Sequence, residues 1–493
     1  MIIQSAAQFA CGFWGNRSVC CQAVEEELSS DGGLLLFAQF DEKRGWTKEF
    51  ASLISDSRVD PEHSVLSMVR QRVFGILAGY EDQNDHDTLR SDPVFKLISG
   101  QEVEDDDLAS QPTISRLENM VTAVDLLKME RWFVERFVNS FEETPELITL
   151  DIDTFDDATH GEQQLTFWHD YYKQNQYQVR VITCAENDMV VLPGLLFGSA
   201  SVKLGAADEL SLVIKRVRER FPDVRIHVRA DSGFGGNDVY DALESFPGVT
   251  YSAGMSINSK TKQLSQSLYE QTIAAQQESG LDELRYMSVA DYKAKYWTRS
   301  RPLVIKCEAT AHSTSRRVVV SNHPDAVDKP EAVYREYAQR GESENRNKEL
   351  KCELAADRLS DHRYMANLFR LMMHCVSHNI LVSLRRLAAL DEPQLGTTEP
   401  EPTDDRPEPT KRETTNRSFR ETRQDRKVHN DRRRRDPLGE GHPCTWRTHV
   451  IKVAARIVIS TRRVVLQLSA NWPHLRYFRH VADVIKRYRP MVT

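Results

Sequence analysis

The stretch Leu147-Ile-Thr-Leu-Asp-Ile-Asp-Thr154 decides the fold. Its apolar residues Ile148, Leu150 and Ile152 alternate with polar ones, the period of a strand with one buried face. Asp151 and Asp153 share the opposite face, where the strand is expected to end. The stretch therefore predicts both a strand of a sheet and a candidate site at its end.

More strand and helix patterns follow this stretch. The strand-like runs lie at 178–184, 189–197, 224–231 and 249–254, and the helical patterns lie at 206–221 and 237–246. Strands that first pair and then alternate with helices indicate an α/β domain, a mixed sheet with helices on its faces. Asp231 closes the run at 224–231, directly before the tight turn Ser232-Gly-Phe-Gly235, which presents its carboxylate at the edge of the sheet.

The rest of the chain divides around this core. Apolar residues at helical spacing predict a helical N-terminal region, and β-branched runs near 286, 303 and 316 predict a β-rich insertion. A stretch rich in Pro, Thr, Asp, Glu and Arg predicts a flexible linker. The expected regions are 1–145 (helical), 146–256 with 329–390 (core), 257–328 (insertion), 391–442 (linker) and 443–493 (basic C-terminal segment).

The composition is that of a globular protein of several domains. Apolar residues make up 40% and charged residues 28% of the 493 positions. No apolar run reaches the roughly 18 residues of a membrane span, and the N-terminus lacks the basic start of a signal peptide. The eight cysteines are scattered and form no CxxC pair, which favours reduced thiols in a cytoplasm over a structural zinc site.

Charge is distributed unevenly along the chain. The formal net charge is −8, but 406–436 carries twelve Lys and Arg against six Asp and Glu, and 447–489 contains Asp483 as its one acid. An acidic front and a basic rear fit a local surface for a polyanion. A solvated basic tail is the alternative, and charge alone leaves both open.

A second motif consists of Tyr337, Arg340, Glu344 and Lys351, at steps of three, four and seven residues. On one helix over 331–360 these steps would align all four side chains along one face. An acid surrounded by two cations and a tyrosine favours metal-assisted chemistry on phosphate.

Glu344 would add a third carboxylate to the two strand-end acids. Asp153, Asp231 and Glu344 together offer the hard oxygen ligands that suit Mg²⁺ or Mn²⁺, in a site with room for two ions. The plain alternative makes each acid an ordinary strand-end carboxylate. Asp151 competes with Asp153, since residues two apart on a strand point the same way.

The motif Tyr-x2-Arg-x3-Glu-x6-Lys resembles the YREK signature of bacterial insertion-sequence DDE transposases, and three further segments resemble their group 1 branch. The resemblance covers 108–390 well and 446–468 loosely. The similar segments are Leu150-Asp-Ile-Asp153, Thr159-His160-Gly-Glu-Gln163, Arg229-Ala-Asp231 and Ala356-Asp-Arg-Leu-Ser-Asp-His362.

The resemblance implies an RNase H-like core with a β insertion between the second acid and the glutamate. It makes Asp153, Asp231 and Glu344 the catalytic, metal-binding acids, and it assigns Tyr337, Arg340 and Lys351 to DNA phosphates. His160 and Gln163 would position the site. Thr154 and Phe155 depart from the residues expected after the first acid, which keeps Asp151 as an alternative.

The implied function is cut-and-paste DNA transposition in a bacterial cytoplasm, on the nucleoid. Water would hydrolyse a phosphodiester at the terminal inverted repeats. The freed 3′ hydroxyl would then attack target DNA, or first the opposite strand to form a hairpin. Double-stranded DNA is the expected partner, a homodimer the expected active form, and the N-terminal helices the expected readers of the ends. The alternatives are a metal-dependent nuclease without strand transfer and a DNA-binding protein that has lost cleavage.

Other conspicuous residues have plainer interpretations. Asp156 and Asp157 are interpreted as solvated loop acids. Trp168, Tyr171 and Tyr172 are interpreted as core packing rather than base-stacking platforms, and Met372, Met373 and His374 as the core and border of a helix.

Overall fold

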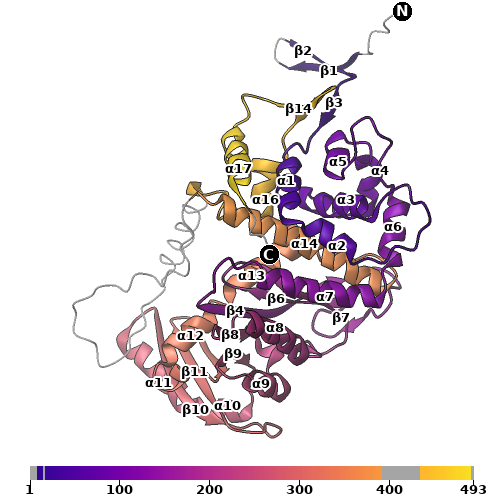
Figure 1. Cartoon of the computed structure of the whole chain (residues 1–493). Coiled ribbons are helices and arrows are strands. Elements are labelled where there is room, and N and C mark those ends of the chain that lie inside the picture. The colour runs from indigo at the N-terminus through magenta and orange to yellow at the C-terminus, as the bar shows by residue number, and fades with distance from the viewer. Residues whose placement is uncertain (1–7, 15–16, 391–433, 490–493) are drawn as a thin grey trace, which may run out of the picture.

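The computed structural model describes residues 8–14, 17–390 and 434–489, and its centre is a nine-stranded mixed sheet (Figure 1). The strand order is β10-β11-β12-β9-β8-β4-β6-β5, with β7 also paired to β6. The strands are β4 (Leu147–Ala158), β5 (Phe167–His169), β6 (Gln174–Cys184), β7 (Val190–Phe197), β8 (Arg225–Ala230), β9 (Val249–Met255), β10 (Glu283–Tyr292), β11 (Arg301–Thr310) and β12 (Thr314–Ser321).

Five of these strands form the expected RNase H-like core. Their order is β7-β6-β4-β8-β9, in which β6 is antiparallel to β4 and to β7, while β8 and β9 run parallel to β4. This order and these directions are those of an RNase H-like sheet, so the predicted fold is confirmed. The stretch predicted to decide the fold is its first and central strand.

Helices cover both faces of this sheet because its strands are apolar on both sides. On one face, Ile148, Leu150 and Ile152 pack with α8 (Ala206–Arg220) and α9 (Asn237–Glu244). On the other face, Phe155, Val179 and Val181 belong to the core built around α14 (Tyr364–Ala388). Asp151 and Asp153 alternate with the first set and therefore lie on the α14 side of the sheet.

The predicted insertion strands are present and extend the sheet. β12 pairs with β9, so β10, β11 and β12 continue the central sheet instead of forming a separate one. Two helices precede them, α10 (Ser259–Leu264) and α11 (Gln266–Ser279). In Figure 1 these elements form the lower end of the molecule.

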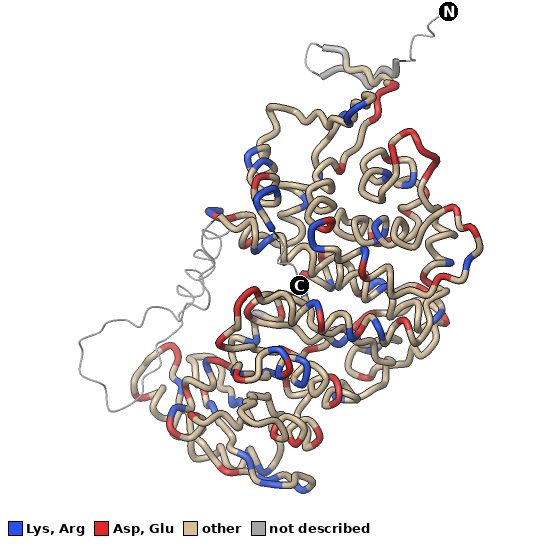
Figure 2. The backbone as a smooth tube through the Cα atoms, viewed as in Figure 1, with Lys and Arg blue, Asp and Glu red and all other residues tan. Residues whose placement is uncertain are grey.

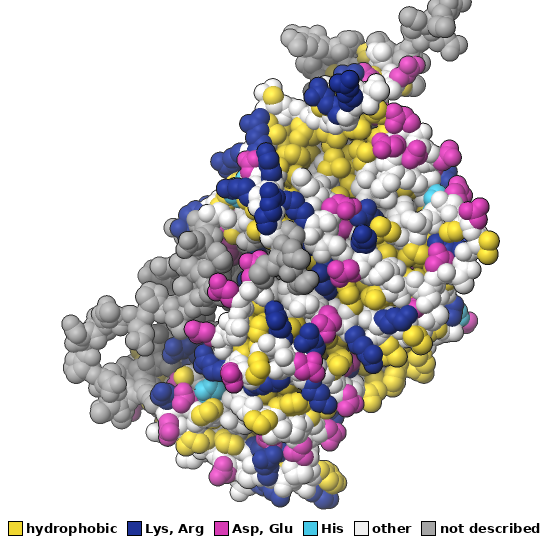
Figure 3. Space-filling view, in the orientation of Figure 1, with side chains coloured by type: hydrophobic (Ala, Val, Ile, Leu, Met, Phe, Trp, Pro, Cys, Tyr) yellow, Lys and Arg dark blue, Asp and Glu magenta, His cyan; other side chains and the backbone are white. Residues whose placement is uncertain are grey.

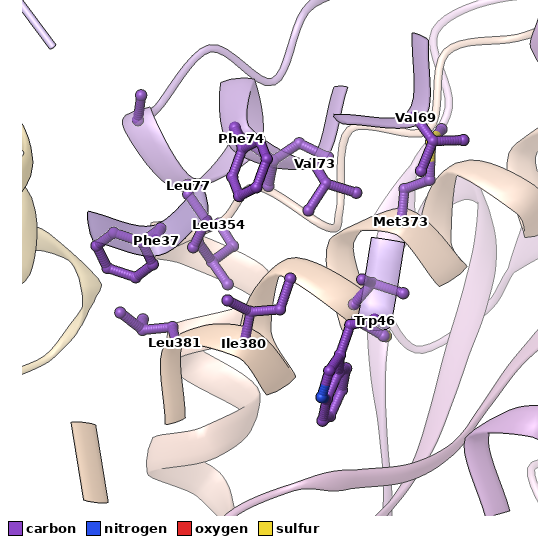
Figure 4. Close-up of a cluster of buried hydrophobic side chains, with 14 of the residues drawn as sticks. Phe37, Trp46, Val69, Val73, Phe74, Leu77, Leu354, Met373, Ile380 and Leu381 are labelled. Carbon is purple, nitrogen blue, oxygen red and sulfur yellow. The ribbon is translucent and has the colours of Figure 1, made fainter. Parts of the chain in front are cut away.

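The N-terminal helices pack against α14, which crosses the middle of the molecule between them and the sheet (Figure 1). Phe37, Trp46, Phe74 and Met373 are among the side chains that meet there (Figure 4). The helices are α1 (Leu34–Arg44), α2 (Trp46–Ser52), α3 (Val65–Ala78), α4 (His86–Leu89), α5 (Pro93–Ile98), α6 (Gln111–Met120) and α7 (Ala123–Val138), with a 3-10 turn, η1 (Gln83–Asp85). Since Met372, Met373 and His374 are buried, their interpretation as helix core is confirmed.

The two ends of the chain meet in a small antiparallel sheet. β3 (Glu27–Ser29) pairs with β13 (Ala455–Ser460), which pairs with β14 (Arg463–Leu468). A separate hairpin, β1 (Gln8–Trp14) and β2 (Arg17–Gln22), precedes β3. The C-terminal helices are α16 (Pro443–Trp446), the π-helix η5 (Arg447–Ile451) and α17 (Leu475–Arg487).

The single helix predicted over 331–360 is wrong. The segment consists of α12 (Pro330–Ala338), α13 (Gly341–Lys348) and a π-helical turn, η4 (Glu349–Glu353). Gly341 follows the break, as its low helix propensity allows, and the π turn rotates the residues after it. Tyr337, Arg340, Glu344 and Lys351 therefore do not share one helical face.

Three further expectations concern the linker, a membrane span and the cysteines. Most of the predicted linker, residues 391–433, lies outside the described residues. Among the residues that are described, no helix is long and apolar enough to cross a membrane. Cys184, Cys307 and Cys375 are free and buried, and Cys20, Cys352 and Cys444 are free and exposed.

A buried carboxylate joins the N-terminal helices to α14. Glu118 of α6 is fully buried, accepts a hydrogen bond from Arg72 Nε at 3.0 Å, and also contacts Gln83 and Arg370. We expect Glu118→Gln to lower the free energy of unfolding by about 3–5 kcal/mol, because two buried guanidinium groups lose their countercharge. Urea denaturation measures this, with Glu102→Gln, at an exposed position of the same region, as the control. Equal effects of the two changes would contradict the assigned role.

Candidate active site

The pairing of β4 with β8 brings two of the predicted acids to one level of the sheet. The last parallel pair is Ile152 with Ala230, so Asp153 and Asp231 each follow it by one residue. The prediction that Asp153 lies at the end of its strand is wrong, because β4 continues to Ala158 by pairing with β6. Asp231 leaves β8 and accepts a hydrogen bond from the Gly233 amide at 2.8 Å.

Arg340 connects the third acid to the first. Its Nη1 lies 3.2 Å from Asp153 Oδ2 and its Nη2 lies 3.0 Å from Glu344 Oε1. The structure therefore brings Asp153, Arg340 and Glu344 together, although they come from β4, the α12–α13 break and α13. The Glu344 side chain is 63% exposed, so it can move relative to the strand acids.

Tyr337 reaches the same site across β9. An ideal Cβ on Gly254 would lie 2.6 Å from the Tyr337 hydroxyl, so the tyrosine needs a glycine at this position. Burial raises the pKa of Tyr337, Arg340 opposes this shift, and the charge of Asp231 adds to it. The same Cβ position on Gly254 lies 3.5 Å from the Asp231 backbone carbon, so the hydroxyl lies close to the segment that carries the second acid. The phenol remains protonated at neutral pH and can donate a hydrogen bond.

The charge of the site disfavours full ionisation. Burial raises the pKa of Asp153 to about 6, and the charges of Asp231 and Glu344 also raise it, while the Thr154 amide and Arg340 lower it. Three carboxylates so coupled repel one another, and a cation relieves that repulsion. Arg340 supplies positive charge between two of them.

Asp151, the competitor for the role of first acid, is engaged in a different network. Its carboxylate is fully buried and accepts hydrogen bonds from Arg229 at 2.6 and 2.7 Å, and Arg346 Nη1 lies 3.3 Å away. Arg346 also pairs with Asp188 at 2.6 Å. The sequence motifs did not identify Arg346 as a residue of the site. Its position two residues after Glu344 was the one feature of the sequence that could have indicated it.

Lys351, in η4, contacts β4 three residues beyond Asp153. Its Nζ is 2.5 Å from Asp156 Oδ1, and this pairing holds the pKa of Asp156 below its ordinary value although burial opposes it. The interpretation of Asp156 and Asp157 as solvated loop acids is wrong: both belong to β4, and Asp157 is fully buried. Burial raises the pKa of Asp157 to about 8.

The core interpretation of three aromatic residues is also wrong. Trp168 is 52%, Tyr171 82% and Tyr172 44% exposed, on the hairpin that joins β5 to β6. Tyr171 and Tyr172 contact each other edge to face at 5.0 Å between ring centroids. Burial and then the charge of Asp156 raise the pKa of Tyr172.

Gln163 fixes the loop between β4 and β5. Its side-chain amide donates to the carbonyls of Leu359 at 2.7 Å and Asp361 at 2.9 Å. It therefore acts in positioning, joining two of the motifs noted in the sequence. His160, in the same loop, is exposed.

The three acids have the oxygen donors of a divalent-cation site, but their side chains are not close enough together to bind one ion. In the part of the chain that the structure describes, no three Asp, Glu, His or Cys side chains are close enough to hold one metal ion. Asp153, Asp231 and Glu344 nevertheless offer carboxylate oxygens, the donors that Mg²⁺ and Mn²⁺ prefer, and one of them is desolvated. The donor set fits, provided that the exposed Glu344 moves inward.

A cavity of about 870 Å³ lies elsewhere, at the amino ends of β4 and β8. Leu147, Arg225, Phe141 and Tyr488 are among its lining residues. The acids follow the other end of the β4–β8 pairing, so this cavity is not part of the candidate site.

Comparison with known proteins gives one family and one solved structure to report. The family model described as transposase DDE domain group 1 matches residues 13–401. A cryo-EM structure of a piggyBac transposase synaptic complex with hairpin DNA is similar with a TM-score of 0.40 and 10% identity, over 73% of this chain and 77% of that one. No curated protein matches the sequence.

The roles of the two neighbouring acids on β4 can be separated by stability. We expect Asp151→Asn to lower the free energy of unfolding by about 3–5 kcal/mol, because Arg229 and Arg346 lose a buried countercharge. Asp153→Asn should change it by less than about 1 kcal/mol, since burial beside two other acids already disfavours the charged form and this offsets the lost pairing with Arg340. Urea denaturation of both variants at neutral pH measures the difference. If Asp153→Asn proved the more destabilising, the assignment would be reversed.

The buried Asp157 predicts a pH-dependent stability. Its pKa is about 8 in the folded protein and about 4 in the unfolded chain, so stability falls as the pH rises from about 4 to about 8 and then levels off. Between pH 5.5 and pH 9 the stability of Asp157→Asn should therefore rise by about 2–4 kcal/mol relative to that of the parent protein. Unfolding at the two pH values tests this, and Asp238→Asn, at an exposed position, should show no such rise.

Proposed function

The chain belongs to group 1 of the DDE transposase family, and from this membership we propose that it cuts and joins DNA at the ends of an insertion sequence. The observation that carries the proposal is the alignment of Asp153 with Asp231 on neighbouring parallel strands, with Glu344 held to Asp153 through Arg340. Carboxylates placed in this way suit phosphodiester chemistry at an RNase H-like sheet.

Asp153, Asp231 and Glu344 would hold Mg²⁺ or Mn²⁺, in two sites that share carboxylates. When bound, such ions activate a water or hydroxyl and stabilise the leaving oxygen of a phosphodiester. The chain itself supplies the position of the strand acids, through the β4–β8 register, and it leaves the Glu344 side chain largely exposed, with room to turn toward them. No side chain needs to form a bond to DNA.

The remaining residues of the motif would hold the DNA end. Arg340 has a planar fork that suits phosphate oxygens, and it becomes free for them once the charge of its two carboxylates is otherwise compensated. Tyr337 would donate its hydroxyl to a phosphate beside Asp231. Lys351 would contribute a point charge, exchanging Asp156 for phosphate.

The full cycle proposed is cut-and-paste transposition in a bacterial cytoplasm. Hydrolysis at an inverted-repeat end frees a 3′ hydroxyl, which then attacks target DNA directly or after a hairpin on the opposite strand. Because two ends must be cut and joined together, we propose a homodimer as the active form. These steps rest on the family together with the acids, and a nuclease without strand transfer is the nearest alternative.

Glu344 gives the direct test. We expect Glu344→Gln to reduce cleavage of end-bearing DNA in Mn²⁺ by more than about 100-fold, because even partners outside a metal's ligand shell contribute about 10- to 100-fold. DNA affinity should remain within a factor of about three, as the residue is exposed and the fold does not depend on it. Asp238→Asn, an exposed acid near Asp231 in the chain, is the matched control.

The products of the parent protein separate the alternatives. Nicked ends together with joined product support the transposase. Nicking without joining would indicate a nuclease, and binding without nicking would indicate a protein that has lost cleavage. Undiminished cleavage by Glu344→Gln would show that the assigned acids are wrong.

A further inference from the structure

The C-terminal segment lies beyond the residues matched by the family model, yet it is firmly built into the fold. Tyr477, Val481 and Ile485 of α17 are buried in the large core that contains α14 and the N-terminal helices. Lys43 of α1 donates from Nζ to the carbonyls of Ile485 at 2.6 Å and Tyr488 at 3.0 Å. A cation at the last carbonyls of a helix stabilises them and its dipole. The orientation of α17 is therefore fixed.

The outward side of this segment is strongly basic. On α17 the cations follow one another at steps of three, seven and one residues, which still places them on one side of the helix, opposite its buried residues. The hairpin of β13 and β14 adds two more, one in its turn and one at the start of β14. Six exposed cations form what we call the C-terminal basic face: Arg462, Arg463, Arg476, Arg479, Lys486 and Arg487.

These six cations are not neutralised by the protein. In the described part of the chain none of them forms an ion pair with Asp or Glu; Arg476 contacts Tyr477, and Arg487 donates to the backbone carbonyl of Asp483 at 3.3 Å. Asp483 is the one acid in 447–489. Figure 3 shows dark blue side chains gathered over α17 and the adjoining hairpin.

The N-terminal helices carry the opposite charge. Exposed acids cluster in the loop between α5 and α6, where Glu102, Glu104, Asp105, Asp106 and Asp107 are all exposed. Figure 2 shows red segments on that side of the molecule and blue segments on α17. A polyanion is repelled by the first surface and attracted by the second.

We propose that the C-terminal basic face binds the phosphate backbone of the double-stranded DNA that carries the element end; this rests on the proposed function and names a surface that holds its substrate. The expectation that the N-terminal helices read the terminal inverted repeats stays a prediction beside this one. The backbone is bound by a segment that packs on these helices, and their own acidic loop faces away from DNA.

The chemistry of the face favours DNA over other polyanions. Five of its six cations are arginines, whose planar forks bind phosphate oxygens in pairs. From Arg476 to Arg487 the helix rises about 16 Å, comparable with the roughly 12 Å width of the major groove. The apolar side of α17 is buried in the core, so the helix has no free face with which to enter a membrane surface.

The test is the salt dependence of binding by the full-length protein to duplex DNA that carries the element end. The variant is the triple change Arg476→Gln, Arg479→Gln and Lys486→Gln. We expect its affinity at about 0.1 M salt to fall at least about tenfold, and the slope of log affinity against log salt to decrease in magnitude by about 2–3, since each lost phosphate contact removes about 0.9. The folded state should be unaffected, as checked by circular dichroism and urea midpoint, because all three side chains are exposed.

A matched control removes the same charge elsewhere. Arg116→Gln, Lys128→Gln and Arg131→Gln together neutralise three exposed cations on α6 and α7. The affinity of this variant should stay within a factor of about two of that of the parent protein, and its salt slope should be unchanged, because its cations lie on the acidic side of the molecule.

The outcomes separate this proposal from the proposed function. If the parent protein binds and cleaves ends while the C-terminal variant keeps the parent's affinity and slope, the basic face is not the DNA surface and the proposed function stands. If the parent protein neither binds nor cleaves ends, the proposed function itself fails. A variant whose loss appears only with duplex RNA of the same length would overturn the assignment to DNA.

Discussion

The fully buried ion pair of Asp151 with Arg229 and Arg346 is the interaction on which the site depends. Arg229 ties β4 to β8 at the position just before the two strand acids, and Arg346 ties β4 to α13 two residues after Glu344. Buried ion pairs contribute little net stability, because desolvation offsets their attraction. Their consequence here is geometric: one carboxylate fixes the strand register and the helix that together place Asp153, Asp231 and Glu344.

Around this rigid base the site is electrostatically strained. Asp153 is buried beside two other acids, which favours its protonated form, and Arg340 compensates only part of the charge. The positions of the strand acids are set by hydrogen bonding within the sheet, whereas Glu344 is exposed on a short helix after a break. A site with two fixed acids and one movable acid can close around a cation at little cost to the fold, since no core residue has to move.

The strand pattern allowed most of the RNase H-like core to be predicted, because alternation within β4 and the strand–helix alternation after it are local properties. What failed was set by contacts distant in sequence. β4 runs on to Ala158 because it pairs with β6, which turned the supposed loop acids Asp156 and Asp157 into strand residues. The spacing from Tyr337 to Lys351 matched one helix. The break before Gly341 and the π turn at 349–353 divide this segment into three elements, so the four side chains do not share one face. Tyr171 and Tyr172 are exposed because their short hairpin lies at the edge of the sheet, which composition does not reveal.

The fold also converts a charge gradient along the sequence into an asymmetry in space. Pairing of β3 with β13, and of Lys43 with the end of α17, places the basic C-terminal segment directly against the first helices of an acidic N-terminal region. The net charge of −8 would otherwise repel a polyanion from every side. Because the cations are gathered on one fixed helix while a cluster of acids lies in the 102–107 loop, attraction and repulsion act on different faces, which would orient a polyanion on the C-terminal basic face. Net charge is therefore a poor guide to the partners of this protein, and the placement of α17 is a better one.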